Sequence, residues 1–268
     1  MTTLAVAVTG RGVIPVHEPV IRADDEALSR GRAVFETLRV YGGRRFRLEE
    51  HLDRLEQSAE RIGLDPPPRD ELKWLSAAAL KEGGALDAML RLTWTPGGVG
   101  IALVAEVPEE IDAMRERGAK LASLTGPIGS APWLLGGVKS TSYAVNMAAQ
   151  AEAQRRGADD AIFVTPDGIV LEGPTTNVWW RTGATLYTPA LELGILAGVT
   201  RAALIELSPW PVEQGAFPCH DLYDADELFT SSSVREVMPV VELDGRPIPR
   251  GPAGDELQAA LRRAALPG

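Results

Sequence analysis

The chain has 268 residues, which suits one large domain or two small ones, and with 45% hydrophobic and 24% charged residues it has the composition of a globular protein. Its formal net charge of −10 argues against a general nucleic-acid binder, which needs a cationic face, but leaves an anionic small-molecule substrate open. The single cysteine, Cys219, excludes an intrachain disulfide and fits a reducing compartment.

Nothing in the sequence indicates export or membrane insertion. No run approaches the roughly 18 consecutive apolar residues of a membrane span, and residues 1–12 do not resemble a signal peptide. We therefore expect a cytoplasmic protein with no membrane partner.

The first 120 residues read as strands and helices in separate runs, which is typical of an α+β unit. Alternating, β-branched segments closed by glycine turns predict strands over 4–8, 33–40, 45–48, 88–95 and 101–107. Apolar residues at helical spacing predict helices over 49–62 and 70–81. We expect this part, residues 1–120, to be a small N-terminal domain.

The composition changes after this part, because residues 125–137 are rich in Gly and Pro and show no hydrophobic periodicity. We interpret 121–137 as an interdomain connection and 138–268 as a larger C-terminal domain. The same patterns predict helices over 142–156, 200–207 and 256–264, and strands over 161–164, 169–171, 177–181, 185–187, 228–230 and 240–243.

Lysine chemistry has only four candidates, Lys73, Lys81, Lys120 and Lys139. The first two lie on a predicted exposed helix and are typical of solvated charge, and Lys120 is typical of a strand edge. Lys139 differs, because it follows Gly-Gly-Val and precedes Ser-Thr-Ser-Tyr just before a helix. Burial or a neighbouring cation there would lower the pKa of its amine and make it nucleophilic.

Other signals each have an ordinary structural interpretation beside the functional one. Glu172 is typical of a turn or cap, and Arg54 of a helix salt bridge. The helix start at 198–200 offers free N–H groups that suit a phosphate, or is simply a cap. Hydroxyls at 231–233 suit the same anion, or shape a turn. Together with Lys139 they are what a pyridoxal-phosphate (PLP) site needs.

Six segments in order make the pattern specific: RGRAVFETLRV, HLDRL, VKSTSY, GADDAIFVTPDGIVLEGPTTNVW, LAGVTR and ADELFTSSSVREVMPVVELDG. With them the chain resembles, over nearly its whole length, the fold-type IV (class IV) family of PLP enzymes. That family includes branched-chain and D-amino-acid aminotransferases and 4-amino-4-deoxychorismate lyase. The resemblance implies a two-domain α+β fold like D-amino-acid aminotransferase, with the cofactor between a small N-terminal and a larger C-terminal domain. It also implies a homodimer.

The resemblance implies a role for each matching residue. Lys139 would hold the cofactor, pyridoxal 5'-phosphate, through a Schiff base and shuttle protons at the substrate carbon. Glu172 would pair with the pyridine nitrogen, and Arg54 would bind the phosphate. Backbone amides and hydroxyls would add further cofactor contacts from Val199, Thr200, Ser232 and Ser233.

Within the family, the length of the chain, the Phe35-Glu36-Thr37 segment and Tyr143 resemble lyases. We therefore expect a 4-amino-4-deoxychorismate lyase that gives 4-aminobenzoate and pyruvate in folate synthesis, acting on a small-molecule amino substrate. Thr37 would relay a proton in catalysis, and Arg91 and Tyr143 are the candidate substrate contacts.

The alternative is a class IV aminotransferase acting on a branched-chain or D-amino acid with a keto-acid acceptor, because the same core residues serve both reactions. The uncharged loop 96–100 argues against the lyase, since some lyases carry an arginine there. No metal site is expected, because Cys219-His220 has no partners at ligand spacing. The three histidines suggest no hydrolase, and His51 is interpreted as structural or close to the cofactor.

Overall fold

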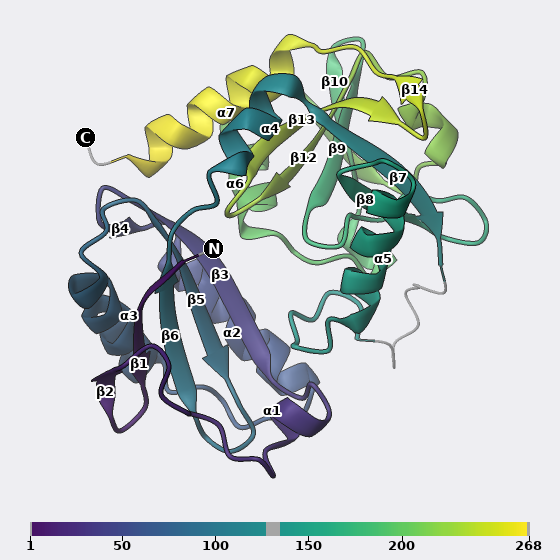
Figure 1. Ribbon diagram of the computed structural model, residues 1–268. Coiled ribbons are helices and arrows are strands. Elements are labelled where there is room, and N and C mark those ends of the chain that lie inside the picture. Colours follow the sequence, from purple (N-terminus) through teal and green to yellow (C-terminus); the bar gives the residue numbers. More distant parts are fainter. Residues whose placement is uncertain (1, 127–134, 267–268) are drawn as a thin grey trace. The chain divides into compact units, whose positions relative to one another are not determined.

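A computed structural model of the protein describes residues 2–126 and 135–266 (Figure 1). The chain divides into two compact units, each described by itself below. Unit 1 comprises Met1–Pro108, Val138–Tyr143 and Ala265–Gly268, and unit 2 comprises Glu109–Gly137 and Ala144–Ala264. The predicted domain limits, 1–120 and 138–268, stay a prediction, and 127–134 of the predicted connection lies outside the described residues.

The described part of unit 1 is built on a six-stranded antiparallel sheet in the order β2-β1-β6-β5-β3-β4 (Figure 1). Its strands are β1 (Thr3–Val8), β2 (Gly12–Ile14), β3 (Val34–Tyr41), β4 (Arg44–Arg45), β5 (Ala88–Trp94) and β6 (Gly100–Ala105). Its helices are α1 (Glu26–Ser29), α2 (Leu48–Arg61) and α3 (Arg69–Gly83).

The two long helices, α2 and α3, pack on one face of this sheet. Strand side chains alternate between faces, and Val34, Leu38 and Val40 of β3 all join one buried cluster with Leu52 and Leu55 of α2. The odd-numbered positions of β3 therefore face the other way, and that second face carries the chemistry described below.

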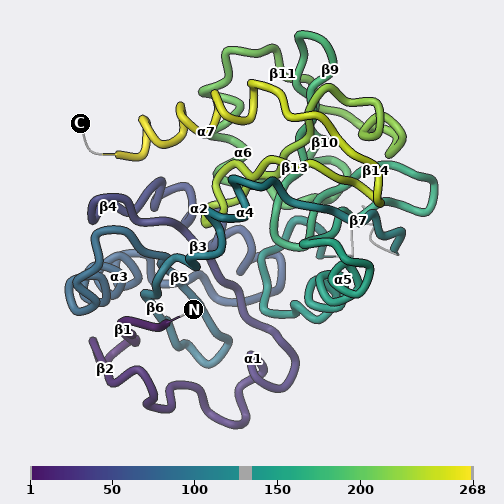
Figure 2. The backbone as a smooth tube through the Cα atoms, turned by 45° about the horizontal axis from the view of Figure 1, so that its top comes forward, coloured from purple at the N-terminus to yellow at the C-terminus, as the bar shows by residue number. Residues whose placement is uncertain are grey.

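The described part of unit 2 is a mixed eight-stranded sheet in the order β11-β10-β9-β12-β13-β7-β8, with β14 pairing with β13. Its strands are β7 (Ala119–Thr125), β8 (Asp160–Val164), β9 (Asn177–Thr182), β10 (Thr185–Pro189), β11 (Val212–Gly215), β12 (Glu227–Ser232), β13 (Glu236–Leu243) and β14 (Arg246–Pro247). Its helices are α4 (Glu110–Arg117), α5 (Ala144–Arg155), α6 (Val199–Leu207), α7 (Pro252–Ala265), η1 (Leu191–Leu193) and η2 (Cys219–Leu222). Small residues of α5, β7 and β8 share one buried cluster, and Figure 2 shows α5 close to β7.

Most predicted elements are present within a few residues of their predicted limits, and three of them differ from the prediction. The predicted strand 45–48 ends at Arg45, because Arg47 takes a left-handed φ of 51° and starts α2. The predicted strand 169–171 makes only isolated bridges, such as Val164↔Val170. Helix α4 was not predicted, because only Ile111 of its eight residues is buried and the helix has no clear apolar stripe.

No helix among residues 2–126 and 135–266 is long and apolar enough to cross a membrane. The cytoplasmic location stays a prediction.

Candidate active site

Lys139 lies in a short segment that pairs with the start of β3. The N–H of Phe35 donates to the Lys139 carbonyl at 3.0 Å, and Ser140 bridges to Val34. The Lys139 N–H donates to the Ser58 hydroxyl of α2 at 3.2 Å. Strand pairing and a helix contact together fix the backbone of the lysine within unit 1.

The same segment is held a second time at Gly31. The Thr141 hydroxyl donates to the Gly31 carbonyl at 2.8 Å and the Ser142 hydroxyl donates to it at 3.0 Å. Gly31 has a φ of +63°, and a Cβ there would lie only 3.0 Å from the Ser142 Cα. Both the backbone conformation and the close approach therefore require glycine.

Gly31→Ala is expected to lower the free energy of unfolding by more than Gly84→Ala, measured by urea denaturation. Gly84 has the same φ of +63°, but a Cβ added there would meet no atom within 4 Å. It therefore reports the left-handed penalty alone, about 1–2 kcal/mol. The contact with Ser142 should add about 1–3 kcal/mol at Gly31. Equal losses in the two variants would mean that the close approach is relaxed at no cost.

Three of the predicted residues meet around the Phe35 ring on the second face of the unit 1 sheet, and a fourth, Thr37, lies on the neighbouring pair of that face. The Lys139 ammonium lies 4.6 Å from the ring centroid and the Arg91 guanidinium 4.0 Å. The Tyr143 ring packs edge-on at 5.3 Å, and Thr37 is the strand partner of Arg91. Cation–π contacts attract an amine and a guanidinium to an aromatic ring, so Phe35 gathers the Lys139 amine, the Arg91 cation and the Tyr143 phenol at one place.

Burial lowers the pKa of Arg91, and the Tyr143 side chain partly opposes that shift. A guanidinium stays protonated at neutral pH even so. Arg91 is therefore a half-buried permanent cation beside the lysine, which suits the recognition of a substrate carboxylate.

On the helix side of the sheet, Glu36 forms a buried triad with His51 and Arg54. The Arg54 Nε and Nη2 donate to the two Glu36 oxygens at 2.7 Å each, and the His51 Nδ1 lies 2.7 Å from Glu36 Oε2. All three side chains are buried. This bidentate ion pair with Glu36 fixes the orientation of the Arg54 guanidinium.

The triad has a defined charge state. Burial by itself raises the pKa of the Glu36 carboxyl, but the charges and hydrogen bonds of Arg54 and His51 outweigh it and bring that pKa to about 2. Burial lowers the pKa of His51 against the opposing effect of Glu36. Because an ionised carboxylate only accepts hydrogen bonds, the His51 Nδ1 carries the hydrogen and donates a hydrogen bond to Glu36.

In unit 2 the predicted acid, Glu172, has its carboxylate oriented by two donors. The Leu196 N–H donates to Glu172 Oε2 at 3.1 Å, and the Asn177 side-chain amide reaches the same oxygen at 3.4 Å. A Cβ on Gly198 would overlap the Asn177 Oδ1. Gly198 therefore lets the start of α6 come close to the amide that orients Glu172.

The α6 start and the β12–β13 hairpin bring the other predicted cofactor residues together. Thr200 in the first turn of α6 is buried, and its hydroxyl lies 3.5 Å from the Ser233 hydroxyl. Ser232 accepts from the Arg235 N–H at 3.2 Å. Helix-start N–H groups and hydroxyls in one place suit a phosphate.

Arg201 was missed in the sequence. It lies one residue after Thr200 and is buried, donating to the Pro189 carbonyl and to Gln214, while its Nε has no hydrogen-bond partner among the described residues. Burial lowers its pKa, opposed by the charges of Glu192 and Glu172. The LAGVTR segment contained this arginine, but nothing in its spacing distinguished a buried cation from a surface one.

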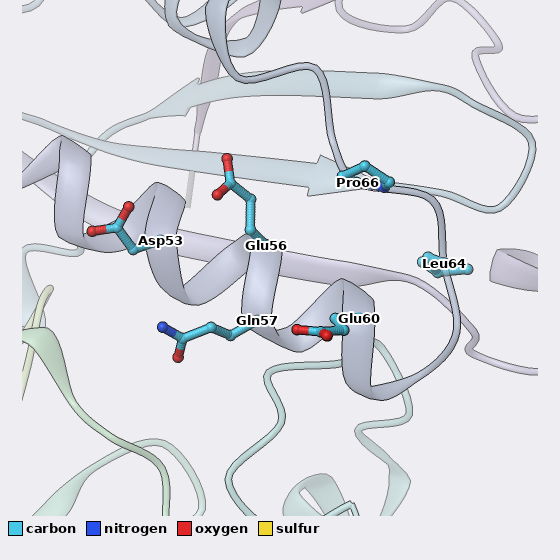
Figure 3. Close-up of a pocket in the computed structure, with 6 residues that line it drawn as sticks. All are labelled: Asp53, Glu56, Gln57, Glu60, Leu64 and Pro66. Carbon is cyan, nitrogen blue, oxygen red and sulfur yellow. The ribbon is translucent and has the colours of Figure 1, made fainter.

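A separate hollow beside α2 is acidic. Figure 3 shows Asp53, Glu56, Gln57 and Glu60 projecting from α2, with Leu64 and Pro66 on the segment that follows. Arg69 pairs with Asp53 at 2.7 Å and with Glu56 at 3.2 Å. Among residues 2–126 and 135–266, no group of three or more His, Cys, Asp or Glu side chains could hold a metal ion.

The donor set fits PLP within each unit. Unit 1 supplies a primary amine, and Arg54 as a buried cation. Unit 2 supplies a carboxylate oriented at Glu172, and the α6 start with the Thr200 and Ser233 hydroxyls. The amine suits the aldehyde of PLP, the carboxylate suits its pyridine nitrogen, and the cation and the helix start suit its phosphate. The individual residue roles, and the placement of the cofactor between domains, stay predictions.

Comparison with known proteins gives concordant matches. The amino-transferase class IV family model matches residues 33–243. The bifunctional aminodeoxychorismate lyase / D-amino acid transaminase of Mycobacterium tuberculosis is 36% identical, covering 92% of this chain and 94% of the relative. The aminodeoxychorismate lyase of Bacillus subtilis is 30% identical, covering 85% and 83%. A solved structure of a hypothetical aminotransferase from M. tuberculosis, in its PLP-bound form, has a TM-score of 0.89 at 34% identity, covering 97% and 98%.

Proposed function

Because the chain belongs to the class IV aminotransferase family, we propose that it is a PLP-dependent lyase that splits 4-amino-4-deoxychorismate into 4-aminobenzoate and pyruvate. The family, the fold-type IV architecture and the cofactor expected from the six motifs are confirmed. The choice of reaction and the residue roles are the proposal.

The observation that supports the lyase best is the group around Phe35. A lyase must move a proton at the amine-bearing carbon and deliver one to the departing enolpyruvyl group, while holding a dianionic substrate. Lys139 supplies the amine, Arg91 a permanent cation and Thr37, the strand partner of Arg91, a hydroxyl. Among the known relatives, two with lyase names are 30% and 36% identical to this chain.

When bound, PLP supplies an electron sink for cleavage at the amine-bearing carbon. In the proposed reaction the Lys139 amine removes the proton from that carbon as general base. Glu172 would pair with the pyridine nitrogen, and Arg54, oriented by Glu36, would bind the phosphate. Thr37 passes a proton to the methylene of the leaving group.

A transaminase on D-amino acids is the second candidate, since the M. tuberculosis relative is named for both activities. The same lysine would then return the proton to a different carbon. The uncharged loop 96–100 favours this candidate, because it offers no second cation for the two carboxylates of the lyase substrate.

The deciding experiment supplies enzymatically generated 4-amino-4-deoxychorismate to the PLP-loaded protein and measures 4-aminobenzoate and pyruvate by chromatography. Equal amounts of the two products, at a rate that depends on the protein, are expected. D- and L-amino acids with a keto-acid acceptor form the second arm. Turnover only in the second arm would overturn the lyase in favour of a transaminase, and Lys139→Ala is the control that must be silent in both.

The proposal includes a homodimer that acts on a small-molecule amino substrate in the cytoplasm. It rests on the family resemblance. Light scattering on the purified protein would give the mass of one or two chains.

A further inference from the structure

The hairpin that carries Ser232 and Ser233 has an unusual residue at its turn. Ser232 of β12 is the strand partner of Glu236 of β13, which leaves a three-residue loop. Glu236 takes a left-handed φ of 57°, a conformation that such loops normally give to glycine. A side chain is strained in this conformation, so turn geometry alone does not account for a glutamate.

The Glu236 carboxylate is completely buried and is held by three side chains. Arg115 of α4 approaches Oε2 at 3.2 Å, and Arg262 of α7 at 3.0 Å. The Gln258 amide, also from α7, donates to the same oxygen at 2.5 Å. A buried carboxylate is stable only with such compensation, and here the first and last helices of unit 2 provide it.

The same side chains also hold the backbone on both sides of Glu236. Arg115 donates to the Arg235 carbonyl at 2.8 Å and to the Val237 carbonyl at 3.3 Å. Gln258 accepts from the Val237 N–H at 2.9 Å. The carboxylate therefore keeps Arg115 and Gln258 in the positions from which they fix the turn.

The hairpin turn also places the two hydroxyls. The Arg235 N–H donates to the Ser232 hydroxyl, and the Arg235 side chain pairs with Asp160 of β8 at 2.5 Å. Ser233 lies against the Thr200 hydroxyl at the start of α6. A shift of the turn would move both hydroxyls relative to the helix start.

We propose that Glu236 is a positioning residue, which through the ion pairs of its buried carboxylate with Arg115 and Arg262 holds the Ser232 and Ser233 hydroxyls at the start of α6 to bind the phosphate of the cofactor. The proposal rests on the proposed function in taking this helix start as the phosphate site. It extends that site to α4 and α7, which carry none of the predicted cofactor residues.

Glu236→Gly separates the two explanations, because glycine satisfies the left-handed turn while it removes the carboxylate. We expect the dissociation constant of PLP, titrated into the apo protein by absorbance, to rise about tenfold, the equivalent of one charge-assisted hydrogen bond. The dissociation constant of pyridoxal, which lacks the phosphate, should change less than about twofold by the same reasoning. Glu236→Gln, which keeps the shape and loses the charge, should shift the PLP constant in the same direction.

Neighbouring arginines on α7 provide a matched pair. Arg262→Met should weaken PLP binding selectively, whereas Arg263→Met, at an exposed position next to it, should not. Thermal unfolding of each apo variant separates a loss of fold from a loss of positioning. Unchanged PLP binding in Glu236→Gly, or a parallel loss for PLP and pyridoxal, would overturn the proposal. Wild-type protein that binds PLP no better than pyridoxal would overturn the phosphate site itself.

Discussion

Lys139→Ala is expected to remove the Schiff-base absorbance of the PLP-loaded protein and to reduce turnover by at least about 10²–10⁴-fold, the usual contribution of a positioned general base. The reason is that the amine beside the Phe35 ring is both the attachment point and the base. Borohydride reduction followed by peptide mass spectrometry would place the cofactor on the peptide that contains Lys139.

Lys120→Ala is the control for this experiment. Lys120 lies on β7 of unit 2 and pairs with Glu242 at 2.9 Å, so it has its own structural partner. That variant should keep both the absorbance and the turnover. Schiff-base absorbance in Lys139→Ala, or a borohydride-reduced label on another lysine, would mean that the attachment site is wrong.

Glu36→Gln is expected to lower the free energy of unfolding by about 3–5 kcal/mol, because it leaves the buried Arg54 without its counter-charge. Urea denaturation would measure the loss. Asp87→Asn is a matched control, since Asp87 binds Arg39 through the same two-pronged geometry but is 57% exposed. An exposed carboxylate of this kind contributes about 0–1 kcal/mol. Similar losses in the two variants would show that the Glu36 triad is not effectively buried.

The difference in the free energy of unfolding between wild type and Glu36→Gln should depend on pH. The pKa of Glu36 is about 2 in the folded protein, below its ordinary value of 4.5, so the carboxylate stabilises the fold above about pH 4.5. That contribution, about 3 kcal/mol at about 1.4 kcal/mol per pKa unit, is lost as the pH falls from about 4.5 towards 2. His51 adds to the acid sensitivity, because its lowered pKa keeps it neutral in the fold. A difference that stayed constant over this range would contradict the assigned charge state.

Much of the fold was predictable because its elements have strong local signals. Apolar residues at helical spacing located α2 and α3, and glycine turns delimited β3, β5 and β6. Helix α4 and strand β7 were not predicted. Helix α4 has no apolar stripe, and β7 is stabilised by parallel pairing with β8 and β13, which are distant in the sequence.

The site divides in the same way. Lys139, Glu172 and Arg54 stand out because they lie in motifs that carry a resemblance. Glu36 belonged to one of those motifs, yet its partners, His51 and Arg54, meet it only when α2 packs on the sheet. One local signal existed: the alternation of β3 puts Glu36 on the same face as Val34 and Leu38, where an acid needs a buried partner. Glu236 had no such signal, because a left-handed turn residue is not visible in composition.

The pairing of the lysine segment with β3 also sets an order of events during synthesis. The contacts that fix Lys139 and Thr141 join residues 81 and 108 positions apart in the chain. Chains leave the ribosome N-terminus first, and contacts over such separations form late because a long loop must close. Helices α2 and α3 can therefore pack on a nascent sheet while its reactive amine is still in the ribosome. Covalent capture of the cofactor therefore requires that synthesis has passed Lys139 and that its segment has paired with β3.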